Sequence, residues 1–195
     1  MMKRVLMIVL ALLICATAGI AESEHRGGRD SDSMNLLNEG IACMNGDGVK
    51  QDYDLAMQCF LEADEAGNKK AARYVGLMYE QGLGVEQDYA QAASWYKKGV
   101  EAGDLTSGYY LAILYKQGLG VGRDYEKAAD YFASVAASDN KSATGVVDAG
   151  YELAQLYELG LGIEQDVDHA IALYREAAKC GSEDAAAALD RLNAE

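Results

Sequence analysis

The sequence has little of what metal centres and nucleophilic catalysis require. Its 195 residues include only two histidines, His25 and His169. No third ligand stands at metal-binding spacing from either, so we expect no metal site. His169 and Cys180 lie eleven residues apart on one expected helix, about three turns, which is too far for a cysteine–histidine pair. No Ser-x-x-Lys motif occurs, and no carboxylate pair is made special by its position.

The chain also lacks a second apolar run long enough to span a membrane. Its one long apolar run, Val5 to Cys15, follows Lys3 and Arg4 and precedes Gly19-Ile20-Ala21. This order is typical of a signal peptide, residues 1–21, cleaved after Ala21. The alternatives are an uncleaved N-terminal anchor and lipidation of Cys15, where the preceding residues resemble a lipobox. We expect a soluble protein, periplasmic or secreted, with a polar, flexible leader at residues 22–32.

Positive charge is scarce. The 17 Lys and Arg face 31 Asp and Glu, a net charge of −14, and removal of residues 1–21 leaves 15 basic residues and a charge of −16. Such a surface repels nucleic acid and anionic membranes, so we expect neither as a partner. It suits a basic partner, although acidity also serves solubility alone.

A Gly-x-Gly element recurs four times. It stands at Gly46/Gly48, Gly82/Gly84, Gly118/Gly120 and Gly160/Gly162, in steps of 36, 36 and 42 residues. A period in this range is typical of a solenoid built from helical pairs. No strand precedes the glycines and no Lys-Ser/Thr follows them, so they turn the backbone between helices and do not form a phosphate loop.

Each unit repeats the same pattern after its glycines. An Asp that can cap a helix start comes first, an Ala follows four residues later, and an aromatic residue four beyond that. These are Asp52, Asp88, Asp124 and Asp166; Ala56, Ala92, Ala128 and Ala170; Phe60, Tyr96, Phe132 and Tyr174. Small and large residues one turn apart interlock on one helix face. Each unit is therefore predicted to be a first helix, a glycine loop and a second helix.

Gly-Leu-Gly-Val, the Asp and Ala that follow it, and the pair Trp95-Tyr96 resemble Sel1-like repeats, relatives of the tetratricopeptide repeat. The resemblance covers roughly Asn35 to Gly181. It implies a right-handed all-α solenoid of four helical hairpins, at about 33–67, 68–103, 104–145 and 146–181. Residues 182–195 resemble a further first helix without a partner, which would close the stack. The third-to-fourth step is longer by six residues, within Ser134 to Gly145.

The resemblance implies a protein-interaction scaffold without catalytic residues or cofactors. Two roles fit an exported member: an adaptor that assembles protein complexes, and an immunity protein that neutralises a toxin delivered to the periplasm. Acidity favours the second role if the toxin is basic. A β-lactam-binding or hydrolysing enzyme, known among cysteine-rich relatives, is the competing class. The absence of a nucleophile–base pair counts against it.

Two cysteines replace large residues in the first unit. Cys43 stands where other units have Tyr79, Tyr115 and Tyr157, and Cys59 where they have Trp95, Tyr131 and Leu173. One interpretation is a disulfide between the two helices, which an exported protein permits. The other is a pair of small buried side chains. Cys180 is left over as a lone thiol.

In tetratricopeptide-like stacks the first helices line a concave wall. Positions on that wall vary between units while core positions repeat, and they carry more apolar surface than a solvated wall needs. An exposed apolar stripe is typical of an interaction site. The alternative is a stripe covered by the leader or by a second copy of the chain. The predicted partner-binding residues are Leu37, Ile41, Arg73, Leu77, Tyr109, Ile113, Tyr151 and Gln155.

Overall fold

The computed structural model describes residues 30–139 and 145–193, and every regular element in those ranges is an α-helix. A first helix covers residues 30–45. The others are α2 (Tyr53–Glu65), α3 (Ala71–Gln81), α4 (Tyr89–Glu101), α5 (Leu105–Gln117), α6 (Tyr125–Ala136), α7 (Val146–Leu159), α8 (Val167–Lys179) and α9 (Glu183–Asn193). Within these ranges, none of the helices has the length and apolar character needed to cross a membrane.

The N-terminal predictions fall mostly outside this part of the chain. The signal peptide and residues 22–29 of the expected leader lie outside the described residues. Residues 30–32, also part of the expected leader, are helical, so that boundary is corrected.

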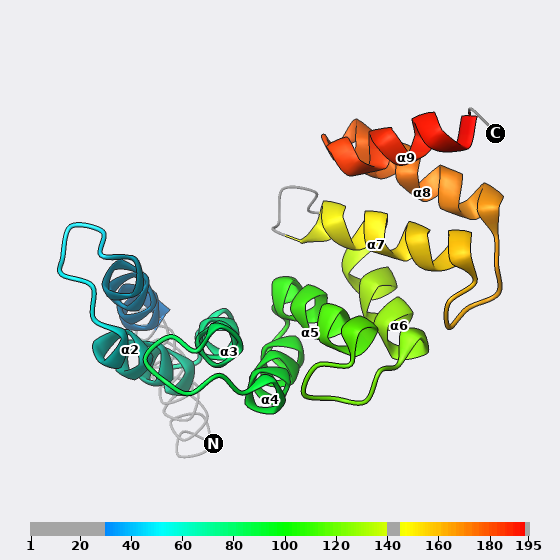
Figure 1. The fold of residues 1–195 in the computed structure, drawn as a ribbon. Helices are drawn as coiled ribbons and strands as arrows, with labels where there is room; N and C mark the ends of the chain where they lie inside the picture. The colour runs from blue at the N-terminus through cyan, green and yellow to red at the C-terminus, as the bar shows by residue number, and fades with distance from the viewer. Residues whose placement is uncertain (1–29, 140–144, 194–195) are drawn as a thin grey trace, which may run out of the picture. The chain divides into compact units, whose positions relative to one another are not determined.

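The chain forms two compact units, one ending at Asn68 and one beginning at Lys69. The first contains one helical hairpin, made of residues 30–45 and α2. The second contains three hairpins, α3 with α4, α5 with α6 and α7 with α8, and each helix packs against the next along the chain (Figure 1). We call the first helix of each hairpin the A helix and the second the B helix. The A helices α5 and α7 also contact each other directly.

Local interactions explain where each B helix begins. The predicted Asp residues are its N-caps: Asp88, for example, accepts hydrogen bonds from the amides of Ala90 and Gln91 at 2.8 and 3.0 Å. The other three caps each accept from the amide three residues on. Each loop also closes on its own A helix, since the Asp88 amide donates to the Tyr79 carbonyl at 2.9 Å. The other three hairpins repeat this bond. These contacts use free amides at a helix start.

The second glycine of a loop is needed where the loop meets the preceding hairpin. Gly120 has a φ of +66°, and a Cβ there would lie 2.1 Å from the carbonyl carbon of Tyr89 at the start of α4. Gly162 meets Tyr125 at the start of α6 in the same way, at 2.4 Å. Only glycine permits both this conformation and this approach.

The core of each hairpin is a B-helix aromatic ring set against a small A-helix residue. A Cβ on Gly76 would lie 2.7 Å from the ring of Tyr96, and one on Gly40 would lie 2.6 Å from Phe60. In the other hairpins the pairs are Ala112 with Phe132 and Ala154 with Tyr174, each pair within one core cluster. All four rings are at most 1% exposed. A large ring on one helix set against a small residue on the other is therefore the packing rule within each hairpin.

The C-terminal helix and the long third step also match the sequence. α9 packs on α8, and the Ser182 hydroxyl oxygen accepts from the Ala185 amide at 3.2 Å. Three residues connect α4 to α5, whereas nine connect α6 to α7, so the six additional residues lie in that connection. These elements confirm the predicted all-α fold of helical hairpins with a closing helix.

Candidate functional site

Six of the predicted partner-binding residues lie on the A helices of the second compact unit, two on each helix. Arg73 and Leu77 are on α3, Tyr109 and Ile113 on α5, and Tyr151 and Gln155 on α7, and all six are half-buried. We call this surface, continued by α9, the A-helix face. Several of its polar side chains form hydrogen bonds and ion pairs within the face.

The tyrosines of this face support the core. The ring centroid of Tyr109 lies 6.0 Å from that of Phe132 and 5.6 Å from that of Tyr110. Tyr110 stacks on Tyr96 at 5.2 Å. Tyr151 lies 5.7 Å from Tyr174. One side of each face tyrosine is therefore committed to packing, and only the remainder is open to a partner.

An ion pair joins the A helices α3 and α5. Nη1 of Arg73 lies 3.3 Å from Oδ1 of Asp104, and the two side chains are only 14% and 6% exposed. Asp104 is also the N-cap of α5, where Oδ2 accepts from the Ser107 amide at 3.0 Å and from its hydroxyl at 2.7 Å. One buried carboxylate thus caps a helix and joins two hairpins.

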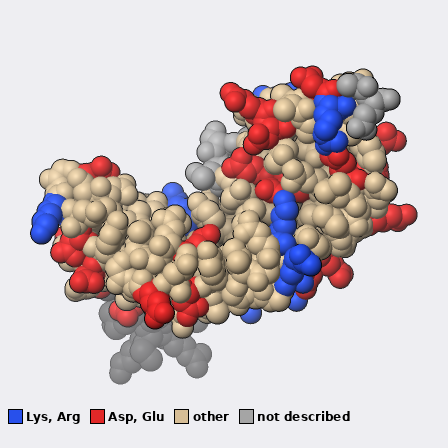
Figure 2. Space-filling view, in the orientation of Figure 1, with Lys and Arg blue, Asp and Glu red and all other residues tan. Residues whose placement is uncertain are grey.

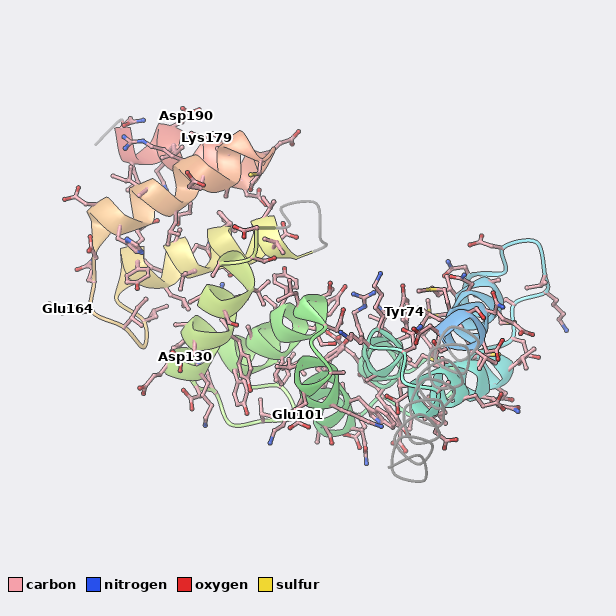
Figure 3. The ribbon with its side chains drawn as sticks, turned by 180° about the vertical axis from the view of Figure 1, so that it is seen from behind. Tyr74, Glu101, Asp130, Glu164, Lys179 and Asp190 are labelled. Atoms are coloured by element: carbon pink, nitrogen blue, oxygen red, sulfur yellow. The ribbon has the colours of Figure 1, made fainter. Side chains whose placement is uncertain are left out.

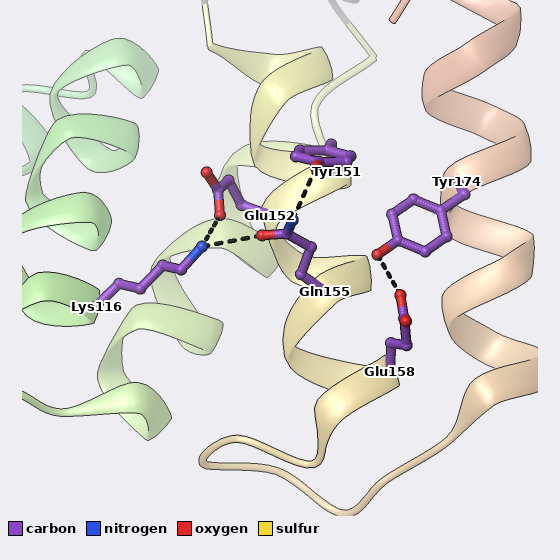
Figure 4. A network of polar contacts seen from close by, with 6 residues as sticks. All are labelled: Lys116, Tyr151, Glu152, Gln155, Glu158 and Tyr174. Atoms are coloured by element: carbon purple, nitrogen blue, oxygen red, sulfur yellow. Dashed lines mark hydrogen bonds and ion pairs between the residues drawn. The ribbon is translucent and has the colours of Figure 1, made fainter. Parts of the chain in front are cut away.

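Further polar bonds join α5 to α7 and α7 to α9. Nζ of Lys116 donates to Glu152 and to Oε1 of Gln155, the latter at 3.0 Å, and Nε2 of Gln155 donates to the Tyr151 hydroxyl at 2.8 Å (Figure 4). On α9, Nη2 of Arg191 donates to Oε1 of Glu158 at 2.6 Å. Polar side chains therefore connect the three A helices α3, α5 and α7, and α9, each to the next.

The sequence analysis did not predict that two A-helix glutamates accept hydrogen bonds from B-helix tyrosines. The buried Tyr96 hydroxyl donates to Glu80, and the Tyr174 hydroxyl donates to Oε2 of Glu158 at 2.8 Å (Figure 4). The hairpins with phenylalanine instead, Phe60 and Phe132, have Met44 and Lys116 at the position of these glutamates. This covariation between tyrosine and glutamate was the available signal, and it explains why two face glutamates are already engaged.

Burial and neighbouring carboxylates raise the pKa values of tyrosines on this face and in the core beneath it. Burial, followed by the hydrogen bond to Glu80, raises the pKa of Tyr96 far above its ordinary value. Burial raises the pKa of Tyr109 to about 12, with further contributions from the charges of Asp148 and Glu152. These hydroxyls remain protonated donors at neutral pH.

In the first compact unit, one of the predicted partner-binding residues is not on the surface. Leu37 is only 3% exposed and Ser33, four residues earlier, is 4% exposed, so this side of the helix faces inward. Leu37 is a core residue and cannot offer its side chain to a partner. At the position of Leu37, the other A helices carry the half-buried residues Arg73, Tyr109 and Tyr151. Ile41 is half-buried.

The repeated geometry corresponds to a known family. A model described as Sel1 repeat matches residues 38–68, 69–104, 109–140 and 147–182. The chain belongs to the Sel1 repeat family. Proteins of this family generally serve as protein-interaction scaffolds. None of the curated proteins matches this chain in sequence.

Solved Sel1 repeat structures are similar to this one. One from Oxalobacter formigenes is 28% identical with a TM-score of 0.74, over 82% of this chain and 63% of that one. A protective antigen of uropathogenic Escherichia coli is 24% identical with a TM-score of 0.54, over 82% and 41%. Cysteine-rich protein B of Helicobacter pylori is 23% identical with a TM-score of 0.52, over 74% and 99%. The chain spans less than two thirds of the first two.

One junction of this Sel1 array is underpacked. A partly open cavity of about 130 Å³ lies between α6, α7 and α8, with the exposed residues Glu176 and Cys180 in its lining. One repeat earlier, Val135 and Val100 approach the Cβ position of Gly108 to 3.0 and 3.7 Å, whereas nothing lies within 4 Å of the equivalent Gly150. The residues equivalent to the two valines are Ala177 and Ala136, both in the cavity wall. Loss of the valine methyl groups accounts for the empty volume.

The Sel1 cysteines are free thiols in this structure. Cys43 and Cys59 are buried and Cys180 is exposed. Burial raises the pKa of Cys59, and the charges of Glu39, Cys43 and Glu62 raise it further, so its reactive thiolate is disfavoured. The predicted disulfide is not formed here and stays a prediction. Among the described residues, no group of three His, Cys, Asp or Glu is arranged to hold a metal ion.

Proposed function

We propose that this protein is an exported, non-catalytic adaptor that binds another protein through the A-helix face of residues 69–195. The observation that carries the proposal is the set of polar bonds between successive A helices. Arg73 with Asp104, Lys116 with Glu152, and Arg191 with Glu158 hold α3, α5, α7 and α9 in register. A surface already ordered before binding loses less entropy when a partner docks.

The side chains of the face also suit protein binding. Tyr109, Tyr110 and Tyr151 are half-buried, so each offers a rigid ring edge beside polar groups. Tyrosine and arginine are enriched among residues that dominate binding energy at protein interfaces. Membership of a family of protein-interaction scaffolds supports the same conclusion.

The test is site-specific photo-crosslinking in an envelope extract. A photoreactive phenylalanine analogue replaces Ile113 on the A-helix face in one variant and Asp130, exposed on α6, in the control (Figure 3). We expect one protein to crosslink in stoichiometric amounts from position 113 and not from position 130, with both variants showing the wild-type circular dichroism. Crosslinking only from position 130, or no partner from either position, would refute the proposal.

Export is tested separately. The N-terminal sequence predicts cleavage after Ala21, so mass spectrometry of the protein from the producing cell should find an N-terminus at or near Glu22. A soluble protein that retains Met1 would contradict export without bearing on the binding face.

A further inference from the structure

Two equivalent tyrosine–aspartate pairs, which we call notches, lie on the A-helix face, one at each of the last two junctions between A helices. In each, a tyrosine of one helix stands next to an aspartate from the first turn of the following helix. The pairs are Tyr109 on α5 with Asp148 on α7, and Tyr151 on α7 with Asp184 on α9. The start of each following helix packs on the tyrosine, since a Cβ on Gly145 would lie 3.0 Å from the Tyr109 ring and Tyr151 packs against the core cluster that contains Ala185. The aspartate charges also raise the pKa values of the two tyrosines.

The register of the helices makes the two notches equivalent. Between α5 and α7, Lys116 bonds Gln155, 39 residues on, and Tyr109 and Asp148 have the same separation. Between α7 and α9, Glu158 bonds Arg191, 33 residues on, and Tyr151 and Asp184 have that separation. Each notch therefore lies about two turns before a polar bond of its own junction.

The cations on the described helices α5 and α9 are already engaged, and the aspartates are exposed. Lys116 pairs with Glu152 and Arg191 with Glu158. Asp148 and Asp184 lie in solvent-facing positions beside half-buried rings. Acidic side chains gather over α7 to α9 in Figure 2. An aromatic ring beside a carboxylate is complementary to a guanidinium or ammonium group, which each attracts.

We propose that the two notches bind two cationic side chains of one extended segment of the partner protein. This inference rests on the proposed function and specifies the chemistry of the partner. Axes of contacting helices lie about 8–10 Å apart. An extended segment in the polyproline II conformation has three residues per turn and rises about 3.1 Å per residue, so residues three positions apart lie on the same side of it, about 9 Å apart. The two cationic residues should therefore be three positions apart, as in Arg-x-x-Arg.

The probe is a short capped peptide with two arginines in this spacing among glycines and serines. Its binding is measured by titration calorimetry and amide chemical shifts in about 0.15 M salt, where long-range attraction is screened beyond about 8 Å. We expect shifts that concentrate on α5, α7 and α9. We expect weaker binding of a peptide with adjacent arginines.

The deciding comparison uses two double variants with equal loss of charge. Asp148→Asn/Asp184→Asn removes the carboxylates of the notches, and Asp130→Asn/Glu164→Gln removes exposed carboxylates on α6 and in the α7–α8 loop (Figure 3). Loss of two exposed ion pairs should weaken binding about fivefold or more in the first variant. The control should change it less than about twofold, the small residual effect of screened charge. Thermal melting by circular dichroism checks that both variants are folded.

Equal weakening in the two variants, no weakening in the first, or no binding of the probe to the wild type at millimolar concentration would overturn the inference. The proposed function can survive each of these results. If the crosslink from position 113 persists in Asp148→Asn/Asp184→Asn, the face still binds a partner, and only its assigned chemistry is wrong.

Discussion

Asp104 gives the most direct test of how the A-helix face is held together. Asp104 and Asp88 are both N-cap aspartates that accept backbone hydrogen bonds at the start of a helix. They differ in what else they hold. Asp104 is buried and also bonds Arg73 and the hydroxyl of Ser107, whereas the capping bonds of Asp88 are exposed. Replacing each by alanine therefore removes the same cap in two surroundings.

The magnitudes follow from these contacts. Loss of an N-cap costs about 1 kcal/mol, and this should be the whole effect of Asp88→Ala. Asp104→Ala also removes a charge-assisted bond and leaves buried donors unpaired, which adds about 2 kcal/mol. We therefore expect Asp104→Ala to lower the free energy of unfolding by about 3 kcal/mol. In a chain of this size, the difference between the two variants corresponds to about 4–8 °C in Tm.

The assay is guanidinium denaturation followed by circular dichroism, with a double-mutant cycle between Asp104→Ala and Arg73→Met. The cycle should give a coupling energy of about 1–2 kcal/mol, because the two residues are in contact. If the two alanine variants lose equal stability and the cycle shows no coupling, the bond between hairpins contributes nothing. The preformed face would then lose its physical basis.

Three further predictions concern packing and thiols. Gly76→Ala places a methyl group 2.7 Å from the Tyr96 ring, so overpacking should outweigh the gain in helix propensity and destabilise the protein by about 1 kcal/mol; denaturation that shows a gain would contradict this. Ala177→Val adds two methyl groups at the 130 Å³ cavity and should stabilise by about 1 kcal/mol after the helix-propensity cost of valine; a lower denaturation midpoint would argue against a true cavity. If Cys43 and Cys59 are oxidised in the exported protein, reduction should lower the free energy of unfolding of the wild type by about 3 kcal/mol. It should not change that of the double alanine variant. A count of three free thiols in unreduced protein would exclude the bridge.

Local sequence signals were sufficient for the hairpins. Asp88 caps α4 by bonding amides two and three residues away. The Tyr96 ring meets Gly76 within the same hairpin. Because each repeat must solve the same packing problem, these residue types return at a fixed period, and the period is visible in a single sequence. Helix type, loop position, capping and the closing helix could be predicted for this reason.

The candidate site was only partly predictable. Helical spacing placed Arg73, Tyr109 and Tyr151 on the A helices, and the structure has them there. It did not reveal that their exposed area is limited by the rings beneath them, nor that Leu37 is buried. Spacing fixes the direction of a side chain relative to its own helix. Exposure depends also on what lies opposite, which spacing does not specify.

The sequence by itself determined the repeated hairpin, because every hairpin uses the same short-range contacts. Only the tertiary structure decided how the A helices are joined. Arg73 reaches Asp104, Lys116 reaches Glu152, and Glu158 accepts from Arg191, over separations of 31, 36 and 33 residues. The combination of residue types differs at each junction, and the direction of charge is reversed at the last one, so no period marks them. Their pairing follows from the distance between neighbouring helices, which exists only once the hairpins have stacked.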